Sequence, residues 1–139
     1  MATIKVDIVS AEREIFSGEA AMVFAPALLG EVGIAPGHAA LLTRMAPGEV
    51  RVRLAGGEEQ AFYVSGGMLE VQPKVVTVLS DTAIRAHDLD EAAVLKAKQE
   101  AEETLKDRSS KLDVAKAQAE LAELAAQLLT IQRLRRRGG

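Results

Sequence analysis

The sequence predicts an antiparallel β-sandwich or barrel followed by an antiparallel pair of helices. The 139-residue chain changes character near His87: all 4 prolines and every aromatic residue precede it, and the only glycines after it are Gly138 and Gly139. Short segments with alternating polarity fill the first part, and strong helix formers fill the second. We therefore expect two domains, residues 1–87 and residues 88–139.

The first part has the pattern of several short strands. Apolar and polar residues alternate over residues 3–8 and again over residues 50–54, which is the period of a strand with one buried face. Residues 55–58 (Ala-Gly-Gly-Glu) offer a hairpin turn, and β-rich runs cover residues 60–72 and 75–79. No long helical pattern separates these runs, so an antiparallel sheet is favoured over a parallel sheet with helical crossovers.

The second part begins with a helix N-cap signal. Residues 88–91 (Asp-Leu-Asp-Glu) place a side-chain acceptor before a glutamate, and helix formers continue from Leu89 to about Asp107. Residues 108–110 (Arg-Ser-Ser) interrupt the pattern, and a second helix is predicted from about Leu112 to Arg136. A short break between two helices favours an antiparallel hairpin.

The first helix carries one apolar stripe and the second carries two. A hairpin needs one apolar face for its partner helix, and alanines there would allow close approach. A second face must bury against the strand domain or another protein. The hairpin could therefore pack flat on the strand domain, or use the two packings at different times. The stripes are Val94, Ala97, Ala101 and Leu105 in the first helix, then Ala115, Ala119, Ala122 and Ala126, and Leu121, Leu124, Leu128 and Ile131, in the second.

Basic residues gather at the C-terminal end of the chain, as Arg133, Arg135, Arg136 and Arg137. Cations at a helix C-terminus stabilise the helix dipole by about 0.3–1 kcal/mol each, which is one sufficient explanation. An acidic partner is the functional alternative. Nucleic acid is disfavoured because the net charge is −3 and aromatic residues make up only 3% of the chain, with none near the arginines.

The sequence contains no pattern that predicts catalysis or a metal site. The absence of cysteine excludes disulfides, thiolate metal ligands and cysteine nucleophiles. His38 and His87 lie far apart without ligand spacing, and Pro36 interrupts the glycine-rich stretch 30–37 where a phosphate-binding loop would begin its helix. No apolar run is long enough to span a bilayer, and no signal peptide is evident. We expect a soluble, non-catalytic protein without a cofactor.

Three stretches carry a resemblance to a known family: DIVSAEREIFSG (7–18), GEVGIAPGHAALLTRMAPGEVRV (30–52) and YVSGGMLEVQPKVVTVLSDTAIRAHDLDEA (63–92). With the alanine-rich terminal helix, they make the chain resemble the epsilon subunit of bacterial F-type ATP synthases over nearly its whole length. Gly-Ile-x-Pro-Gly-His before Leu-Leu-Thr, and Ser-Gly-Gly-x-Leu-Glu-Val, are specific to that family.

The resemblance implies a ten-stranded β-sandwich followed by a two-helix hairpin. It implies a non-catalytic central-stalk subunit that joins the gamma subunit to the c ring, without inserting into the membrane, at the cytoplasmic face of a bacterial plasma membrane. In the family, loops at one end of the sandwich sit on the c ring. Ser10, Glu31 and His38 are the docking residues expected here.

The resemblance also implies a regulatory hairpin. Folded, it lies on the sandwich; opened, it rises along gamma into the alpha–beta hexamer and blocks ATP hydrolysis. The bulky stripe would serve packing or insertion, and the terminal arginines would meet an acidic segment of the beta subunit.

One departure from the family concerns nucleotide binding. ATP-sensing members carry an arginine where this chain has Ala93, so we expect ATP binding to be weak or absent. Another departure is Ala40, where many members have proline. The competing hypothesis is a free-standing ligand-binding β-domain with a helical dimerisation arm.

Overall fold

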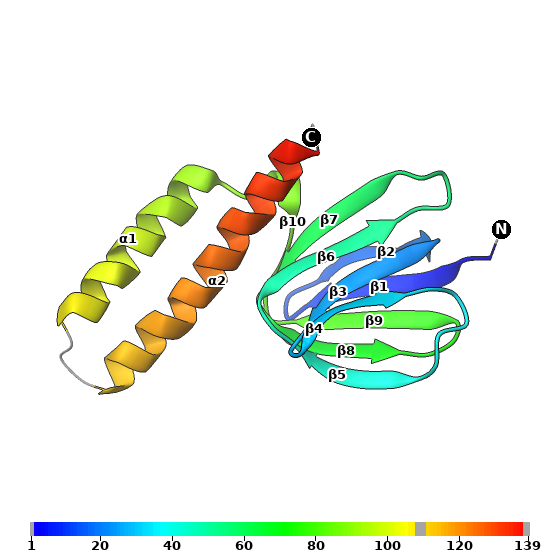
Figure 1. Ribbon diagram of the computed structural model, residues 1–139, viewed down its shortest axis with the longest axis horizontal. Helices are drawn as coiled ribbons and strands as arrows, with labels where there is room; N and C mark the ends of the chain where they lie inside the picture. Colours follow the sequence, from blue (N-terminus) through cyan, green and yellow to red (C-terminus); the bar gives the residue numbers. More distant parts are fainter. Residues whose placement is uncertain (1, 108–110, 138–139) are drawn as a thin grey trace.

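The computed structural model describes residues 2–107 and 111–137, which form a β-sandwich followed by a helical hairpin (Figure 1). The short 3-10 helix η1 (Ala86–Asp88) leads into α1 (Glu91–Asp107) and α2 (Lys111–Arg136). This architecture confirms the predicted fold class. The strands are β1 (Ile4–Ser10), β2 (Glu14–Ala20), β3 (Met22–Ala27), β4 (Gly30–Ile34), β5 (Leu41–Met45), β6 (Gly48–Arg53), β7 (Glu59–Val64), β8 (Gly67–Val71), β9 (Val75–Ser80) and β10 (Ala83–Arg85).

The strands form one sheet in the order β10-β7-β6-β3-β5-β8-β9-β1-β2, with β4 paired to β3. β3 and β5 share a single residue pair, Ala27 with Met45, and the sheet folds over at this weak connection. Contacts of β10 with β1 and β2 bring the two ends of the path together, so the sandwich is close to a barrel. The prediction of an antiparallel sheet holds for every pair except β1 with β9, which is parallel because the N-terminal strand inserts between β9 and β2.

Alternation along the strands builds the core. The inward residues of β1 and β6, among them Ile4, Val50 and Val52, are fully buried, and burying each such side chain contributes about 1.5–3 kcal/mol. The same alternation in β6 turns Glu49 and Arg51 to the opposite, outward face. Glu49 and Arg51 therefore stand on the outer surface of the sandwich.

In the hairpin, α2 lies between α1 and the sandwich (Figure 1). The bulky stripe of α2 packs against α1, where Leu124 meets Val94 and Ala101 in one apolar cluster, with Leu121 and Leu128 beside them. The expectation that the alanine stripe faces α1 is wrong, because Ala115, Ala119 and Ala122 are exposed. Leucines bury more apolar area per residue than alanines, so the leucine stripe takes the helix–helix contact.

Asp90 is the N-cap of α1. Its Oδ1 accepts hydrogen bonds from the backbone N–H groups of Ala92 (3.1 Å) and Ala93 (3.3 Å), which satisfies two of the donors that a helix start leaves free. This cap explains why α1 begins at Glu91 rather than at Leu89.

Candidate functional site

The face of α2 that meets the sandwich carries several polar side chains, together with Leu134, which lines a cavity with Ala61 and Ala86. Thr130 is 1% exposed, and the side chains of Gln127 and Glu123 on the same helix face lie beside Tyr63 and Asp81 of the strand domain. The alanine stripe is not buried against the strand domain, because Ala115, Ala119 and Ala122 are exposed, so its contact with another protein stays a prediction. The helices hold each other through apolar contacts, whereas the hairpin meets the sandwich through several polar side chains as well as Leu134.

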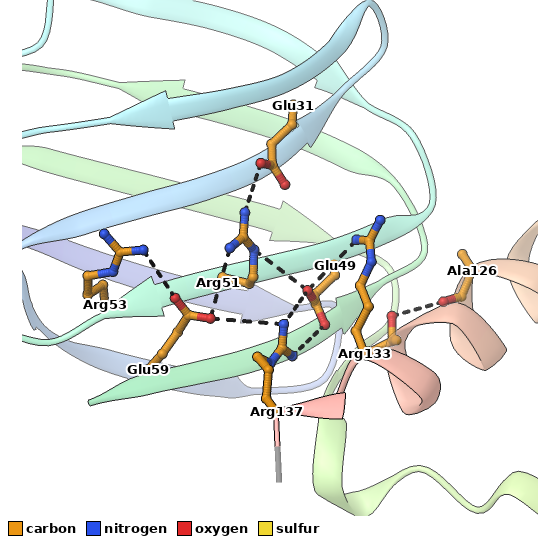
Figure 2. Close-up of polar contacts among 9 residues, drawn as sticks. Glu31, Glu49, Arg51, Arg53, Glu59, Ala126, Arg133 and Arg137 are labelled. Atoms are coloured by element: carbon orange, nitrogen blue, oxygen red, sulfur yellow. Dashed lines mark hydrogen bonds and ion pairs between the residues drawn. The ribbon is translucent and has the colours of Figure 1, made fainter. Parts of the chain in front are cut away.

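Glu49 of β6 is the centre of that interface (Figure 2). Its side chain is only 1% exposed. Arg137 donates two hydrogen bonds to it, Nη2 to Oε2 at 3.0 Å and Nη1 to Oε1 at 3.3 Å. The Nη1 of Arg133 lies 3.9 Å from Oε1, and the Nε of Arg51 lies 3.7 Å away. A bidentate arginine–carboxylate pair is among the strongest polar contacts in proteins.

Further ion pairs extend this centre across the outward face. Arg51 Nη2 lies 2.8 Å from Glu31 Oε1, and its guanidinium stands 4.3 Å from the centre of the Phe24 ring. Glu59 lies within 4.0 Å of Arg51, Arg53 and Arg137. We call these side chains, from β4, β6, β7, α2 and the residue directly after α2, the Glu49 cluster: Glu31, Glu49, Arg51, Arg53, Glu59, Arg133 and Arg137 (Figure 2).

The cluster holds four cations and three anions, so α2 supplies the positive charge that the strands lack. The hydrogen bond to Glu49 raises the pKa of Arg137 above its ordinary value, and the charges of Glu49 and Glu59 act in the same direction against the opposing effect of burial. Arg137 therefore stays charged whenever it is docked.

The terminal arginines divide between two surfaces. Arg133 and Arg137 bind Glu49 on the sandwich, whereas Arg135 pairs with Glu91 at the start of α1. Arg136 is exposed. From the sequence, the gathering of arginines at the C-terminal end was explained by the helix dipole or by an acidic partner. An acidic residue of the same chain was not considered. Only the fold brings Glu49 and Arg137 together, because they are 88 positions apart.

Tyr63 lies under α2 and is fully buried. Its hydroxyl has no hydrogen-bond partner of normal geometry among residues 2–107 and 111–137. Burial raises the pKa of Tyr63 to about 12 from an ordinary 10.0, against the opposing effect of the neighbouring Gln127 amide. It is the only tyrosine in the chain.

Glu123, on the sandwich-facing side of α2, is a second unfavourable group in this interface. Burial raises its pKa, and the negative charges of Glu120 and Asp81 raise it further. The docked interface thus contains an attractive cluster near the end of α2 and an unfavourably placed carboxylate about four turns earlier.

The predicted docking residues do not share one surface. Ser10 ends β1 beside Ser80, and its hydroxyl accepts bonds from the N–H groups of Glu12 and Arg13 in the following turn. Through the pairs Met45–Gly67 and Ala27–Gly30, that end of the sandwich also holds the β3–β4 turn, next to Glu31.

His38 lies at the opposite end of the sandwich. The adjacent Gly37 N–H donates to the Pro73 carbonyl at 2.9 Å, and Pro73 lies near Lys5, at the other end of β1 from Ser10. The stretch from Gly30 to Ile34 is a strand rather than a loop, and it runs along the sandwich. The expectation that Ser10, Glu31 and His38 form one end surface is therefore wrong.

Neither a metal site nor a membrane-spanning helix is found among residues 2–107 and 111–137. Within residues 2–107 and 111–137, no three acidic, histidine or cysteine side chains converge on a possible metal position. In the same ranges, neither α1 nor α2 is long and apolar enough to cross a bilayer.

Comparison with known proteins identifies the family. Residues 3–86 match the ATP synthase delta/epsilon chain beta-sandwich domain, and residues 87–132 match the long alpha-helix domain of the same chain. The chain belongs to the ATP synthase delta/epsilon family. The ATP synthase epsilon chain of Nitrosococcus oceani is 66% identical over 137 residues, covering 99% of this chain and 98% of the relative. The epsilon chain of Halorhodospira halophila is 58% identical with the same coverage.

Two solved structures share the delta/epsilon fold. One is a chain of the Euglena gracilis mitochondrial ATP synthase, with a TM-score of 0.85 and 21% identity, covering 94% of this chain and 82% of the other. The other comes from the central stalk and c ring of the Tetrahymena thermophila enzyme, with a TM-score of 0.65, 14% identity and coverages of 94% and 97%. At these identities the likeness shows the fold.

The ionisation of Tyr63 tests how the packing of the hairpin on the sandwich depends on pH. Because its folded pKa is raised, the neutral phenol favours the docked state: this contribution is fully present below pH 10.0 and is lost as pH rises through about 12. Ultraviolet titration of tyrosinate in the full chain should show ionisation near pH 12, and Tyr63→Phe should remove the corresponding loss of stability between those values. Ionisation near pH 10.0 in the folded chain would contradict the burial of this group.

Proposed function

We propose that this delta/epsilon-family chain is a non-catalytic central-stalk subunit of a proton-translocating F-type ATP synthase. It couples the gamma subunit to the c ring, and its hairpin inhibits ATP hydrolysis after leaving the sandwich. The observation that carries the proposal is the match to curated epsilon chains over 99% of this chain and 98% of theirs. That match favours the stalk subunit over the alternative of a free-standing ligand-binding domain. The chain would lie peripherally at the cytoplasmic face of the bacterial plasma membrane.

The two kinds of hairpin contact support movement of the hairpin as a unit. Leu121, Leu124 and Leu128 hold α2 to α1, so the helices keep their apolar core when they separate from the sandwich. The sandwich-facing side, with Gln127 and Thr130, exposes several polar groups on separation. Interfaces of this composition resemble transient ones, and partners can decide which state is populated.

The geometry of α2 suits an extended state. Its 26 residues reach about 39 Å at a rise of about 1.5 Å each. The exposed stripe at Ala115, Ala119 and Ala122 leaves a surface that another helix can approach closely. Insertion between the alpha and beta subunits would bring Arg133, Arg135, Arg136 and Arg137 to an acidic beta segment, and Ile131 with the leucine stripe would lie nearby.

Rotor contacts would use the surfaces that α2 leaves uncovered. We assign c-ring docking to the end that holds Ser10 and Glu31, where the β3–β4 turn exposes Leu28 (58%) and Leu29 (104%). His38 lies outside this surface. On the second half of the sheet, the exposed Leu79 stands beside Val9 and Met68, and Leu42 is exposed on β5. We assign this apolar face to the gamma subunit.

Docking on the ring can be tested at the β3–β4 turn. Leu29→Gln should weaken binding of the full chain to isolated c ring about tenfold, because the variant removes an apolar side chain from the contact. Ala55→Gln, on the β6–β7 turn, is the matched control. Equal binding by both variants in a sedimentation assay would contradict this assignment.

Inhibition can be tested by removing the hairpin. We expect the reconstituted alpha–beta–gamma complex to hydrolyse ATP several-fold faster with a chain ending at Asp88 than with the full chain, while the amount of bound subunit stays the same. Unchanged hydrolysis with intact assembly would show that the hairpin is a passive support.

ATP binding by this subunit is proposed to be weak or absent. Ala93 stands where ATP-sensing relatives have arginine, and Asp90 is engaged as the helix N-cap. Calorimetry of the full chain with ATP should show no binding at micromolar concentrations, and a clear micromolar isotherm would refute this expectation.

A further inference from the structure

We propose that Glu49 is an internal acceptor for the terminal arginines of α2 and competes with the acidic surface that would bind them in the extended hairpin. Glu49 would thereby set how readily the hairpin leaves the sandwich. The inference rests on the proposed function, because the terminal arginines can bind either Glu49 or an acidic partner only if the hairpin leaves the sandwich.

The first argument is the burial of Glu49. A carboxylate that is 1% exposed is stable only beside cations or strong donors. Two of the three arginines around it come from the end of the hairpin: Arg133 in α2 and Arg137 directly after it. The third, Arg51, is already shared with Glu31 and Glu59. Docking of α2 therefore supplies most of the charge that Glu49 requires.

The second argument is where attraction is concentrated along α2. At Glu123 the partial burial of the carboxylate opposes docking, and the negative charges of Glu120 and Asp81 add to this effect. At Arg137, about four turns later, the hairpin makes two hydrogen bonds to one carboxylate. Because the strongest attraction lies in the last turn, loss of that single contact should release the helix from the sandwich.

The third argument is exclusivity. A guanidinium fork pairs with one carboxylate in bidentate geometry, so Arg137 cannot bind Glu49 and a partner carboxylate at once. Neutralising Glu49 removes one acceptor only, whereas neutralising Arg137 removes the donor that both states use. The two changes should both release the hairpin, yet only the change at Glu49 keeps the donor for the extended state, so it should inhibit ATP hydrolysis more strongly than the change at Arg137.

Release can be measured in the full chain with a single thiol. The sequence has no cysteine, and the buried Thr130 stands on the sandwich-facing side of α2, so Thr130→Cys is labelled by a thiol reagent only when the hairpin opens. In this background, Glu49→Gln and Arg137→Gln should each speed labelling about tenfold or more. Glu58→Gln, an exposed carboxylate on the β6–β7 turn, is the matched control and should leave the rate unchanged. Circular dichroism checks that each variant is folded.

Salt provides a second measurement that needs no change at Glu49. Raising the ionic strength should speed labelling of the Thr130→Cys chain and have little effect once Glu49 is glutamine. Equal labelling of the Glu49→Gln and Glu58→Gln chains, or equal salt sensitivity with and without the Glu49 charge, would overturn the proposal.

ATP hydrolysis by the reconstituted catalytic complex tests the competition. Glu49→Gln should lower hydrolysis below that of the unmodified chain, and Arg137→Gln should give higher hydrolysis than Glu49→Gln. If labelling rises but the two variants hydrolyse ATP equally, the competition is refuted. If the chain ending at Asp88 also leaves hydrolysis unchanged, inhibition by the hairpin fails, while the labelling rates still decide whether Glu49 holds the hairpin.

Discussion

A buried carboxylate is the constraint on which the arrangement of the two domains depends. Transferring an ionised side chain out of water costs several kcal/mol, and only well-placed cations offset that cost. In β6 the carboxylate is Glu49, and the cations come largely from a helix more than 80 residues later in the chain. The surface of the sandwich is thus incomplete without α2, and the position of α2 depends on one side chain of the sandwich.

The contact of α2 with α1 is stronger than its contact with the sandwich. Each leucine buried against α1 contributes about 1.5–3 kcal/mol, whereas the pairing of Glu49 with its arginines must first offset the cost of removing that carboxylate from water. Leu124 is almost fully buried between the helices, while Arg133 and Arg137 are about one-third to one-half exposed. The sandwich contact is therefore the weaker boundary, and separation there leaves the helix–helix core intact.

The sequence predicted those features that local patterns encode. Alternation identified β1 and β6, and the run of helix formers identified both helices to within about two residues. The alanine and leucine stripes were both visible, but which one faces α1 depends on packing against a neighbour that periodicity alone does not name. Long-range pairing was equally out of reach: His38 was grouped with Ser10 by sequence motif, and the strand order places them at opposite ends. The local pattern placed Glu49 at an outward position in a strand, and nothing in it predicted that α2 would bury this carboxylate.

The docked state is favourable at the C-terminal end of α2 and unfavourable near the middle of the helix. Tyr63 has no hydrogen-bond partner of normal geometry for its hydroxyl in the described part of the chain, and Glu123 is a half-buried carboxylate near other negative charges, so both raise the free energy of docking. The Glu49 cluster opposes them within the last turn of the same helix. An element that must change position needs a difference of only a few kcal/mol between its states, because a larger one could not be reversed by a partner. Opposing contributions within one interface are a direct physical route to such a small difference, and the sandwich-facing side of α2 contains both.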